Sequence, residues 1–160
     1  MPGILIATDG SDCAIAAART ALDLFGGRDV TVLSVVDVRP EMGVSGGGLL
    51  GAEPLAMPLP DPVTTGEIDH ALTEEANEAI ERTLAALGDV QARRTVLHGD
   101  PAAEICRIAE HDHYDVIVVG SHGSRFVKRV FVGSVSHHVL HHAPCPVLVV
   151  RCPDKGNKGD

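Results

Sequence analysis

The chain has 160 residues, enough for one domain with a sizeable hydrophobic core. Hydrophobic residues make up 44% of it and aromatic residues only 2%, which favours helices stacked on a parallel sheet over an aromatic-rich β-barrel. The formal net charge of −9 argues against general nucleic-acid binding, because that needs a surplus of lysine and arginine.

The amino terminus leads directly into a hydrophobic run at residues 4–6, without a basic segment or a long apolar stretch. We therefore expect neither a signal peptide nor a transmembrane helix, no membrane partner, and a cytoplasmic protein. The four cysteines, Cys13, Cys106, Cys145 and Cys152, are irregularly spaced and form no CxxC pair. We interpret them as free thiols in a reducing compartment, with Cys13 and Cys145 as small packing residues.

The first part of the chain alternates between predicted strands and helices. The hydrophobic pattern predicts a strand at 3–8, a helix at 14–25, and a nearly continuous apolar strand at 30–38 that would be covered on both faces. Ser11 or Asp12 can cap the helix. Residues 39–66 are rich in glycine and proline without any period, which predicts a long loop that is either a functional lid or a dispensable insertion.

The second part continues the alternation. We expect an amphipathic helix at 67–87, an edge strand at 91–97, a helix at 102–110, a strand at 116–119, a helix from 133–134 to 142 and a last strand at 147–150. Asp100 is the predicted cap of the third helix, with Pro101 at its first position. Residues 1–151 would form a single domain, followed by a disordered tail at 152–160.

Strands that alternate with helices build a parallel sheet with right-handed crossovers, covered by helices on both faces. The predicted fold is therefore a three-layer α/β/α sandwich whose five-stranded parallel sheet has the order 3-2-1-4-5. In that order the first and fourth strands lie side by side at the topological switch point, where ligands bind beyond the carboxyl ends of the strands. Asp9 and Gly120, which end these two strands, would face the same crevice.

Glycines at the end of the fourth strand and the start of the last helix predict a phosphate site. The pattern is Gly-x2-Gly-x9-Gly-Ser, formed by Gly120, Gly123, Gly133 and Ser134. Glycine lets main-chain amides approach a phosphate closely, and the amino terminus of a helix attracts an anion. The segment between these glycines carries three cations, Arg125, Lys128 and Arg129. A plain turn beside a basic surface patch is the alternative interpretation.

The chain also resembles the universal stress protein family. The resemblance rests on ILIATDGS at the amino terminus, LSVVDV in the second strand, HGDPAAEI before the third helix, and VVGSHGSRFVKRVFVGSVSHHVLHHAPCPVLVVR at the end. It covers residues 3–151 except for the 39–66 loop. In this family, which shares the adenine nucleotide alpha hydrolase-like fold, the glycine–serine motif marks the members that bind ATP.

The resemblance implies a set of residues around an ATP molecule, with Mg²⁺ as a possible companion. The base would lie by Asp9 and the Val35 main chain, the ribose and phosphates farther along the two glycine segments. The full set is Ala7, Thr8, Asp9, Val35, Val119, Gly120, Gly123, Arg125, Gly133, Ser134 and Val135. Asp9 has a structural interpretation too, as the amino-terminal cap of the first helix. The family further implies a homodimer that pairs the last strands, Val147 to Val150.

The function that follows is a nucleotide-responsive regulatory or protective module of the stress response. Slow ATP hydrolysis or autophosphorylation is the most we expect of it, because we find no general base, Mg²⁺-binding carboxylate pair or arginine finger. A sensor of AMP or cyclic AMP that uses the same pocket is a second hypothesis. A third is an interaction protein that recruits a partner through the 39–66 loop, independently of nucleotide.

Five histidines lie near the predicted site. His122 is inside the glycine loop, where it could touch a phosphate. His137, His138, His141 and His142 form an HHxxHH pattern on the last predicted helix, and the pair His137 and His141 could chelate Zn²⁺ or Ni²⁺. We favour a solvent-exposed helix face over a metal site, and such a face would titrate at about pH 6 to 7.

Overall fold

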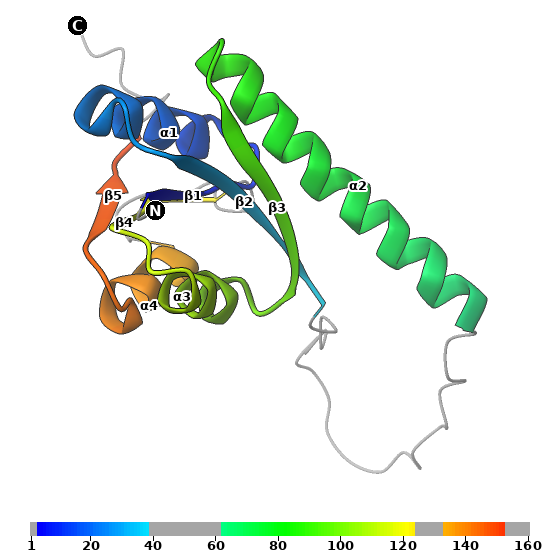
Figure 1. Cartoon of the computed structure of the whole chain (residues 1–160). Coiled ribbons are helices and arrows are strands. Elements are labelled where there is room, and N and C mark those ends of the chain that lie inside the picture. Colours follow the sequence, from blue (N-terminus) through cyan, green and yellow to red (C-terminus); the bar gives the residue numbers. More distant parts are fainter. Residues whose placement is uncertain (1–2, 39–61, 124–132, 153–160) are drawn as a thin grey trace, which may run out of the picture.

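Strands and helices alternate along the whole described chain (Figure 1). The structure is a computed structural model that describes residues 3–38, 62–123 and 133–152. The elements are β1 (Ile4–Ala7), α1 (Asp12–Phe25), β2 (Val30–Asp37), α2 (Pro62–Leu87), β3 (Ala92–Gly99), α3 (Pro101–His111), β4 (Val116–Gly120), α4 (Ser134–His142) and β5 (Val147–Val150).

The five strands form one parallel sheet in the order β3-β2-β1-β4-β5, which confirms the predicted topology. Ile4 of β1 is paired with Val30 of β2 on one side and with Val116 of β4 on the other. The chain therefore reverses its winding direction between β1 and β4. In a sheet of this kind the helices leave a crevice at that point, beyond the carboxyl ends of the two strands.

Helices cover both faces of the sheet, as the pattern of buried strand residues requires. Ile4 and Ile6 are fully buried in a cluster with α1 and α2, whereas Leu5 between them is fully buried in a second cluster with α3 and α4. Successive side chains of a strand point to opposite faces, so a strand that is apolar throughout supplies both clusters. Figure 1 shows the resulting layers, with α1 and α2 on one side of the sheet and α3 and α4 on the other.

Short polar side chains begin two of the helices. Ser11, rather than the residue after it, caps α1 by accepting a hydrogen bond from the N–H of Ala14 at 3.2 Å. Asp100 caps α3 in the same way, with its Oδ1 accepting from the N–H of Ala103 at 2.9 Å. Pro101 follows at the first helical position, where its missing N–H would have had no helical partner. The predicted start of α3 is thus confirmed.

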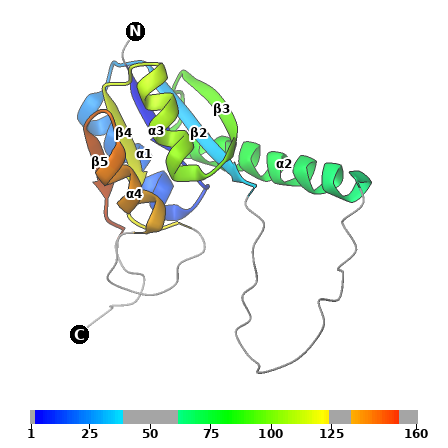
Figure 2. The same cartoon turned by 90° about the horizontal axis from the view of Figure 1, so that it is seen from below.

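The boundaries of α2 and β3 differ from the prediction, and β3 is Ala92–Gly99 instead of 91–97. α2 begins at Pro62 instead of residue 67, so the last residues of the predicted 39–66 loop are helical. Proline suits a first helical position, but the glycine and proline content of this stretch hid the start of the helix. Figure 2 shows the amino-terminal half of α2 extending beyond the sheet. The rest of the predicted loop, 39–61, lies outside the described residues.

Candidate functional site

Asp9 and Gly123 meet across the carboxyl ends of β1 and β4. Asp9 follows β1 and Gly123 follows β4. A Cβ atom built on Gly123 would lie 3.0 Å from Oδ2 of Asp9, closer than side chains normally come. The carboxylate therefore packs directly against the glycine loop, as the predicted strand order required.

The turn between β1 and α1 orients the Asp9 carboxylate. Gly10 has a φ of +73°, a left-handed conformation that glycine adopts without steric strain. The chain then folds back so that Oδ1 of Asp9 accepts a hydrogen bond from the N–H of Ser11 at 3.0 Å. Because Ser11 is the cap of α1, the interpretation of Asp9 as that cap is wrong. The second carboxylate oxygen is the one beside Gly123.

A buried chain of hydrogen bonds ties this turn to α2. The hydroxyl of Thr83 donates to the carbonyl of Ala79 at 2.8 Å. The hydroxyl of Thr8 lies 2.7 Å from that of Thr83 and therefore donates to it, while its oxygen accepts from the N–H of Gly10 at 3.0 Å. We had not predicted a role for Thr83. Its signal was a polar residue within the hydrophobic stripe of a helix.

Gly120 ends β4 at a position where no side chain fits. A Cβ atom there would lie 3.0 Å from Sγ and 3.1 Å from the carbonyl carbon of Cys13, and 3.2 Å from the amide nitrogen of Ala14. Two of these are main-chain atoms at the start of α1, which cannot move aside as the end of a side chain could. The first turn of α1 thus packs directly on the end of β4.

Ser121 connects the glycine loop to β5 and α4. Its N–H donates to the carbonyl of Val150 at 2.9 Å, and its own carbonyl accepts from the N–H of Gly133 at 2.7 Å. Ser136 adds hydrogen bonds from its hydroxyl to the carbonyls of Ser121 at 3.4 Å and Gly133 at 3.0 Å. The two predicted glycine segments are therefore adjacent. Neither of the serines that join them was among the residues we predicted.

At this junction the first turn of α4 lacks a side-chain cap, and one ring nitrogen of His122 lacks a hydrogen-bond partner among the described residues. Gly133 is the N-cap of α4 and supplies no side-chain hydrogen bond to its first turn, and Ser134 is exposed. Nδ1 of His122 lies 2.9 Å from the hydroxyl of Ser121. Nε2 of the same ring is buried and has no hydrogen-bond partner among the described residues. A buried polar atom of this kind is costly unless a ligand or water satisfies it.

The side chains of the remaining predicted residues that the structure describes pack into the core on the α3 and α4 side of the sheet. Val119 is buried in the cluster with α3 and α4. Ala7, Val35 and Val135 are half-buried and pack against the same cluster. Arg125 and the rest of the predicted basic segment lie outside the described residues. The structure thus brings together Asp9 and the glycines, and leaves the predicted cation undescribed.

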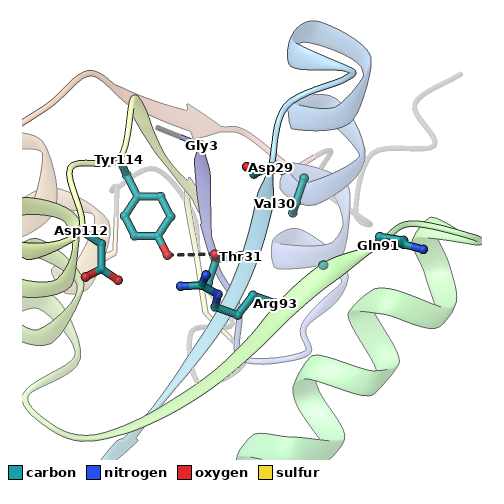
Figure 3. Close-up of a pocket in the computed structure, with 9 residues that line it drawn as sticks. Gly3, Asp29, Val30, Thr31, Gln91, Arg93, Asp112 and Tyr114 are labelled. Carbon is teal, nitrogen blue, oxygen red and sulfur yellow. Dashed lines mark hydrogen bonds between the residues drawn. The ribbon is translucent and has the colours of Figure 1, made fainter. Parts of the chain in front are cut away.

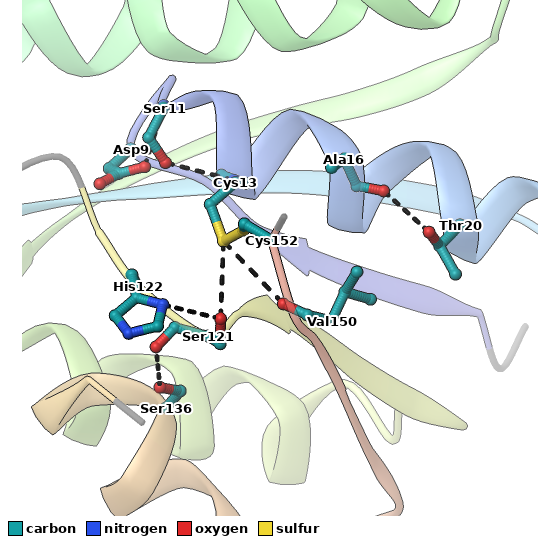
Figure 4. The surroundings of a disulfide bond; sticks show 11 residues. Asp9, Ser11, Cys13, Ala16, Thr20, Ser121, His122, Ser136, Val150 and Cys152 are labelled. Carbon is teal, nitrogen blue, oxygen red and sulfur yellow. Dashed lines mark hydrogen bonds between the residues drawn. A yellow bond between two sulfur atoms is a disulfide. The ribbon is translucent and has the colours of Figure 1, made fainter. Parts of the chain in front are cut away.

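A disulfide bond joins Cys13 to Cys152 beside the end of β4 (Figure 4). The prediction of four free thiols is therefore wrong for these two residues, and Cys152 does not belong to a disordered tail. Their separation of 139 positions in the chain gave no spacing signal. Cys106 and Cys145 are free and half-buried, and burial is the main reason that the pKa of each thiol is raised.

The four histidines of α4 are exposed, which confirms the predicted solvent-facing surface. The rings of His138 and His142 stack at a centroid distance of 4.1 Å, whereas those of His137 and His141 are tilted by 55° at 4.7 Å. Within the described residues, no group of three or more histidine, cysteine, aspartate or glutamate side chains is arranged to hold a metal ion. Nor does that part of the chain contain a helix with the length and hydrophobicity needed to cross a membrane.

A cavity of about 580 Å³ lies at the opposite edge of the sheet, by the amino ends of the strands (Figure 3). The hydroxyl of Tyr114 donates to that of Thr31 at its wall, at 2.8 Å. Arg93 shares the cavity with the carboxylates of Asp29 and Asp112. None of the predicted nucleotide-binding residues lines it. With two carboxylates against one cation, it is a poorer phosphate site than the junction of the glycine segments.

The sequence is similar to known proteins over almost its whole length. The model of the universal stress protein family matches residues 2–151. Universal stress protein MJ0531 of Methanocaldococcus jannaschii is 35% identical over 156 residues, which cover 95% of this chain and 83% of that protein. Universal stress protein YxiE of Bacillus subtilis is 34% identical over 150 residues, which cover 92% of this chain and 97% of that protein.

Solved structures of universal stress proteins also resemble this chain. Protein MJ0577 of Methanocaldococcus jannaschii superimposes with a TM-score of 0.73 at 29% identity, covering 96% of this chain and 98% of that one. UspA from Lactobacillus plantarum has a TM-score of 0.71 at 26% identity, covering 94% and 97%. Three more distant solved structures, which show likeness of fold only, are 21%, 22% and 15% identical to this chain. They are, in that order, a universal stress protein in complex with cAMP, the universal stress protein of Archaeoglobus fulgidus in complex with dAMP, and an Arabidopsis thaliana protein of the same family with AMP bound. By its sequence and its fold, the chain belongs to the universal stress protein family.

Proposed function

We propose that this chain binds ATP in the crevice between β1 and β4 and acts as a regulatory or protective module of the stress response. One observation carries the proposal. Asp9 faces Gly123, while Gly133 is hydrogen-bonded to Ser121, so a carboxylate, a glycine loop and the start of a helix converge on one point. This combination offers a polar contact for a base at one end and main-chain amides for phosphates at the other.

Charge sets the direction in which the nucleotide would lie. The Asp9 carboxylate repels phosphate but accepts hydrogen bonds from the amino group of adenine, so the base belongs on the β1 side with the main chain of Val35. The phosphates belong at the start of α4, where no side chain caps the first amides and the helix dipole favours negative charge. Nε2 of His122 could reach a ligand oxygen there, since it has no hydrogen-bond partner among the described residues.

The predicted residues take their roles from this orientation. Ala7, Thr8, Asp9 and Val35 would surround the base, and Val119, Gly120 and Gly123 would follow the ribose and the first phosphate. Gly133, Ser134, Val135 and Arg125 would hold the outer phosphates. Mg²⁺ would be carried largely by the phosphates and water, because Asp9 is the one carboxylate in this set. We expect at most slow hydrolysis of the bound ATP.

A sensor of AMP or cyclic AMP at the same site is the second candidate. The family members whose solved structures contain cAMP, dAMP and AMP all hold a single phosphate group. The three cations of the glycine segment, Arg125, Lys128 and Arg129, favour a longer phosphate chain, which is the reason we place ATP first. The relative affinities of the protein for ATP, AMP and cyclic AMP separate the two candidates.

Isothermal titration with ATP and Mg²⁺, AMP and cyclic AMP tests the proposal. Gly123→Ala places a methyl group 3.0 Å from the carboxylate of Asp9 and blocks close approach of the ligand. If this substitution costs the nucleotide one charge-assisted hydrogen bond, worth about 2 kcal/mol, the affinity of the protein for ATP should fall about 30-fold. Gly26→Ala is the matched control, because its methyl group meets the carbonyl oxygen of Leu22 at 3.1 Å, away from the crevice.

Binding heat that Gly123→Ala reduces and Gly26→Ala preserves would support the proposed site. Tighter binding of AMP or cyclic AMP than of ATP would favour the second candidate. No binding of any of the three nucleotides at tens of micromolar protein would rule out both. Steady turnover of ATP that Ser134→Ala abolishes would show instead that the protein is a hydrolase.

We further propose that the protein is a cytoplasmic homodimer that pairs β5 with its symmetry mate. β5 is an edge strand whose four apolar residues, Val147–Val150, are only half-buried in the isolated chain. An uncovered apolar edge with free main-chain groups is prone to pair with another strand. Light scattering should give the mass of a dimer, and Val149→Lys should give that of a monomer.

A further inference from the structure

The Cys13–Cys152 disulfide joins two segments that lie on either side of the end of β4. Cys13 is in the first turn of α1, and Cys152 follows β5, with their α carbons 5.3 Å apart. Cys13 is only 7% exposed, whereas Cys152 is half-exposed. Figure 4 shows the bond beside Ser121 and His122, at the entrance to the glycine loop.

A short path of covalent and hydrogen bonds leads from this disulfide to the candidate site. Cys152 is close in sequence to Val150, whose carbonyl accepts the N–H of Ser121 at 2.9 Å. The carbonyl of Ser121 in turn accepts the N–H of Gly133 at 2.7 Å. On the other side, Sγ of Cys13 lies 3.8 Å from the hydroxyl of Ser121. The disulfide thus restrains Ser121 from two directions, and Ser121 positions the start of α4.

We propose that this disulfide is a thiol–disulfide switch that holds the 120–123 loop and the start of α4 in position, so that the oxidised chain binds adenine nucleotide more tightly than the reduced chain. The nucleotide part of this inference rests on the proposed function, whereas the effect on the loop is independent of it. The two states are distinct because the bond is either present or absent, and each state differs in how firmly Ser121 is held.

A low-molecular-weight thiol such as glutathione can operate the switch by thiol–disulfide exchange. Its thiolate attacks the more exposed sulfur, that of Cys152; the protein disulfide breaks, and Cys13 leaves as a thiolate that the amino terminus of α1 stabilises. A second glutathione thiolate attacks the glutathione sulfur of the mixed disulfide and releases Cys152. The protein gains two electrons and two protons, and two glutathione molecules become one glutathione disulfide.

The first test follows the loop without any nucleotide. The full chain is equilibrated with defined ratios of reduced to oxidised glutathione, the disulfide is quantified by mass after alkylation, and amide hydrogen exchange is measured in each form. We expect exchange at Ser121 and Gly133 to be at least about fivefold faster in the reduced chain, in line with ordinary couplings between neighbouring sites. Exchange in the centre of β1 should be unchanged.

The second test titrates both forms with ATP and Mg²⁺. We expect the Kd for ATP to rise at least about fivefold on reduction. Cys13→Ser and Cys152→Ser should each remove the dependence on glutathione, and the second variant changes only a half-exposed residue that a folded chain tolerates. Cys106→Ala is the matched control, because its free thiol lies among the residues that pack with α3 and α4, and it should keep the dependence.

The outcomes separate this inference from the proposed function. Equal exchange at Ser121 and Gly133 in the two forms overturns the switch, as does an equal affinity for ATP where ATP binds. If neither form binds any nucleotide, the proposed function fails, and the exchange measurement alone decides whether the disulfide controls the loop. Persistence of the glutathione dependence in Cys152→Ser would also overturn the assignment.

Discussion

Replacing Thr83 by valine should destabilise the protein, although the two side chains have nearly the same shape. Thr83 is fully buried. Its hydroxyl donates to the carbonyl of Ala79 at 2.8 Å and accepts from the hydroxyl of Thr8, 2.7 Å away. Valine removes both bonds and leaves the Thr8 hydroxyl buried without an acceptor. The Ala79 carbonyl loses little by comparison, because it sits within a helix.

The expected cost is about 2 kcal/mol, composed of about 1 kcal/mol for the lost hydrogen bond and about 1 kcal/mol for the unsatisfied Thr8 hydroxyl. For a protein of this size each kcal/mol corresponds to about 2 to 4 °C, so the melting temperature should fall by about 4 to 8 °C. Urea unfolding followed by circular dichroism measures the same loss at constant temperature. The m-value should not change, since both proteins bury the same surface.

Thr20→Val is the matched control. Its hydroxyl makes the same kind of bond, to the carbonyl of Ala16 at 2.9 Å, but Thr20 is half-buried and water can replace the contact (Figure 4). We expect a cost below about 0.5 kcal/mol. In the double variant Thr8→Val/Thr83→Val, the two losses should couple by about 1 kcal/mol, because the first substitution already breaks the shared bond. A cost for Thr83→Val no larger than that for Thr20→Val, or fully additive losses, would refute the reasoning.

Three further predictions concern a helix cap, a buried hydroxyl and the free thiols. Asp100→Ala should cost about 1 kcal/mol of stability and Asp100→Asn much less, because only alanine removes the capping acceptor; equal urea midpoints would contradict this. Tyr114→Phe should cost about 1 kcal/mol by removing the 2.8 Å bond to Thr31, and an unchanged midpoint would show that water compensates. Cys106 and Cys145 should alkylate more slowly than a free cysteine at neutral pH, with a rate that rises with pH, because burial raises the pKa of each thiol and lowers its thiolate fraction. Rapid labelling of either at neutral pH, followed by mass spectrometry, would contradict it.

Much of the fold could be predicted because its signals are local. Apolar runs, the Asp100 cap with Pro101, and the alternation of strands with helices each depend on residues close together in the chain. The strand order then follows from the handedness of parallel crossovers. The start of α2 at Pro62 escaped prediction because glycine and proline dominate the segment before it, and its helical state depends on the rest of the long helix that follows.

The sequence predicted which segments of the candidate site lie together, but not the side chains that connect them. Asp9 and the glycines could be assigned to one crevice from strand order, and they do lie together at the ends of β1 and β4. What each of them binds stays a prediction. Ser121, which joins the glycine segments, gave no signal, because a serine in a loop has many possible partners until the loop is placed.

The sequence by itself determined the layers of this protein, its sheet order and its family, since periodicity, caps and motifs are carried by neighbouring residues. Only the tertiary structure decided which distant side chains meet. Thr8 bonds to Thr83 because α2 packs on the face of the sheet that carries Ile4 and Ile6 of β1. Cys13 joins Cys152 across 139 positions because they follow β1 and β5, whose carboxyl ends lie at the same edge of the parallel sheet. Contacts of that kind depend on distances of a few ångströms in space, which spacing along the chain does not encode.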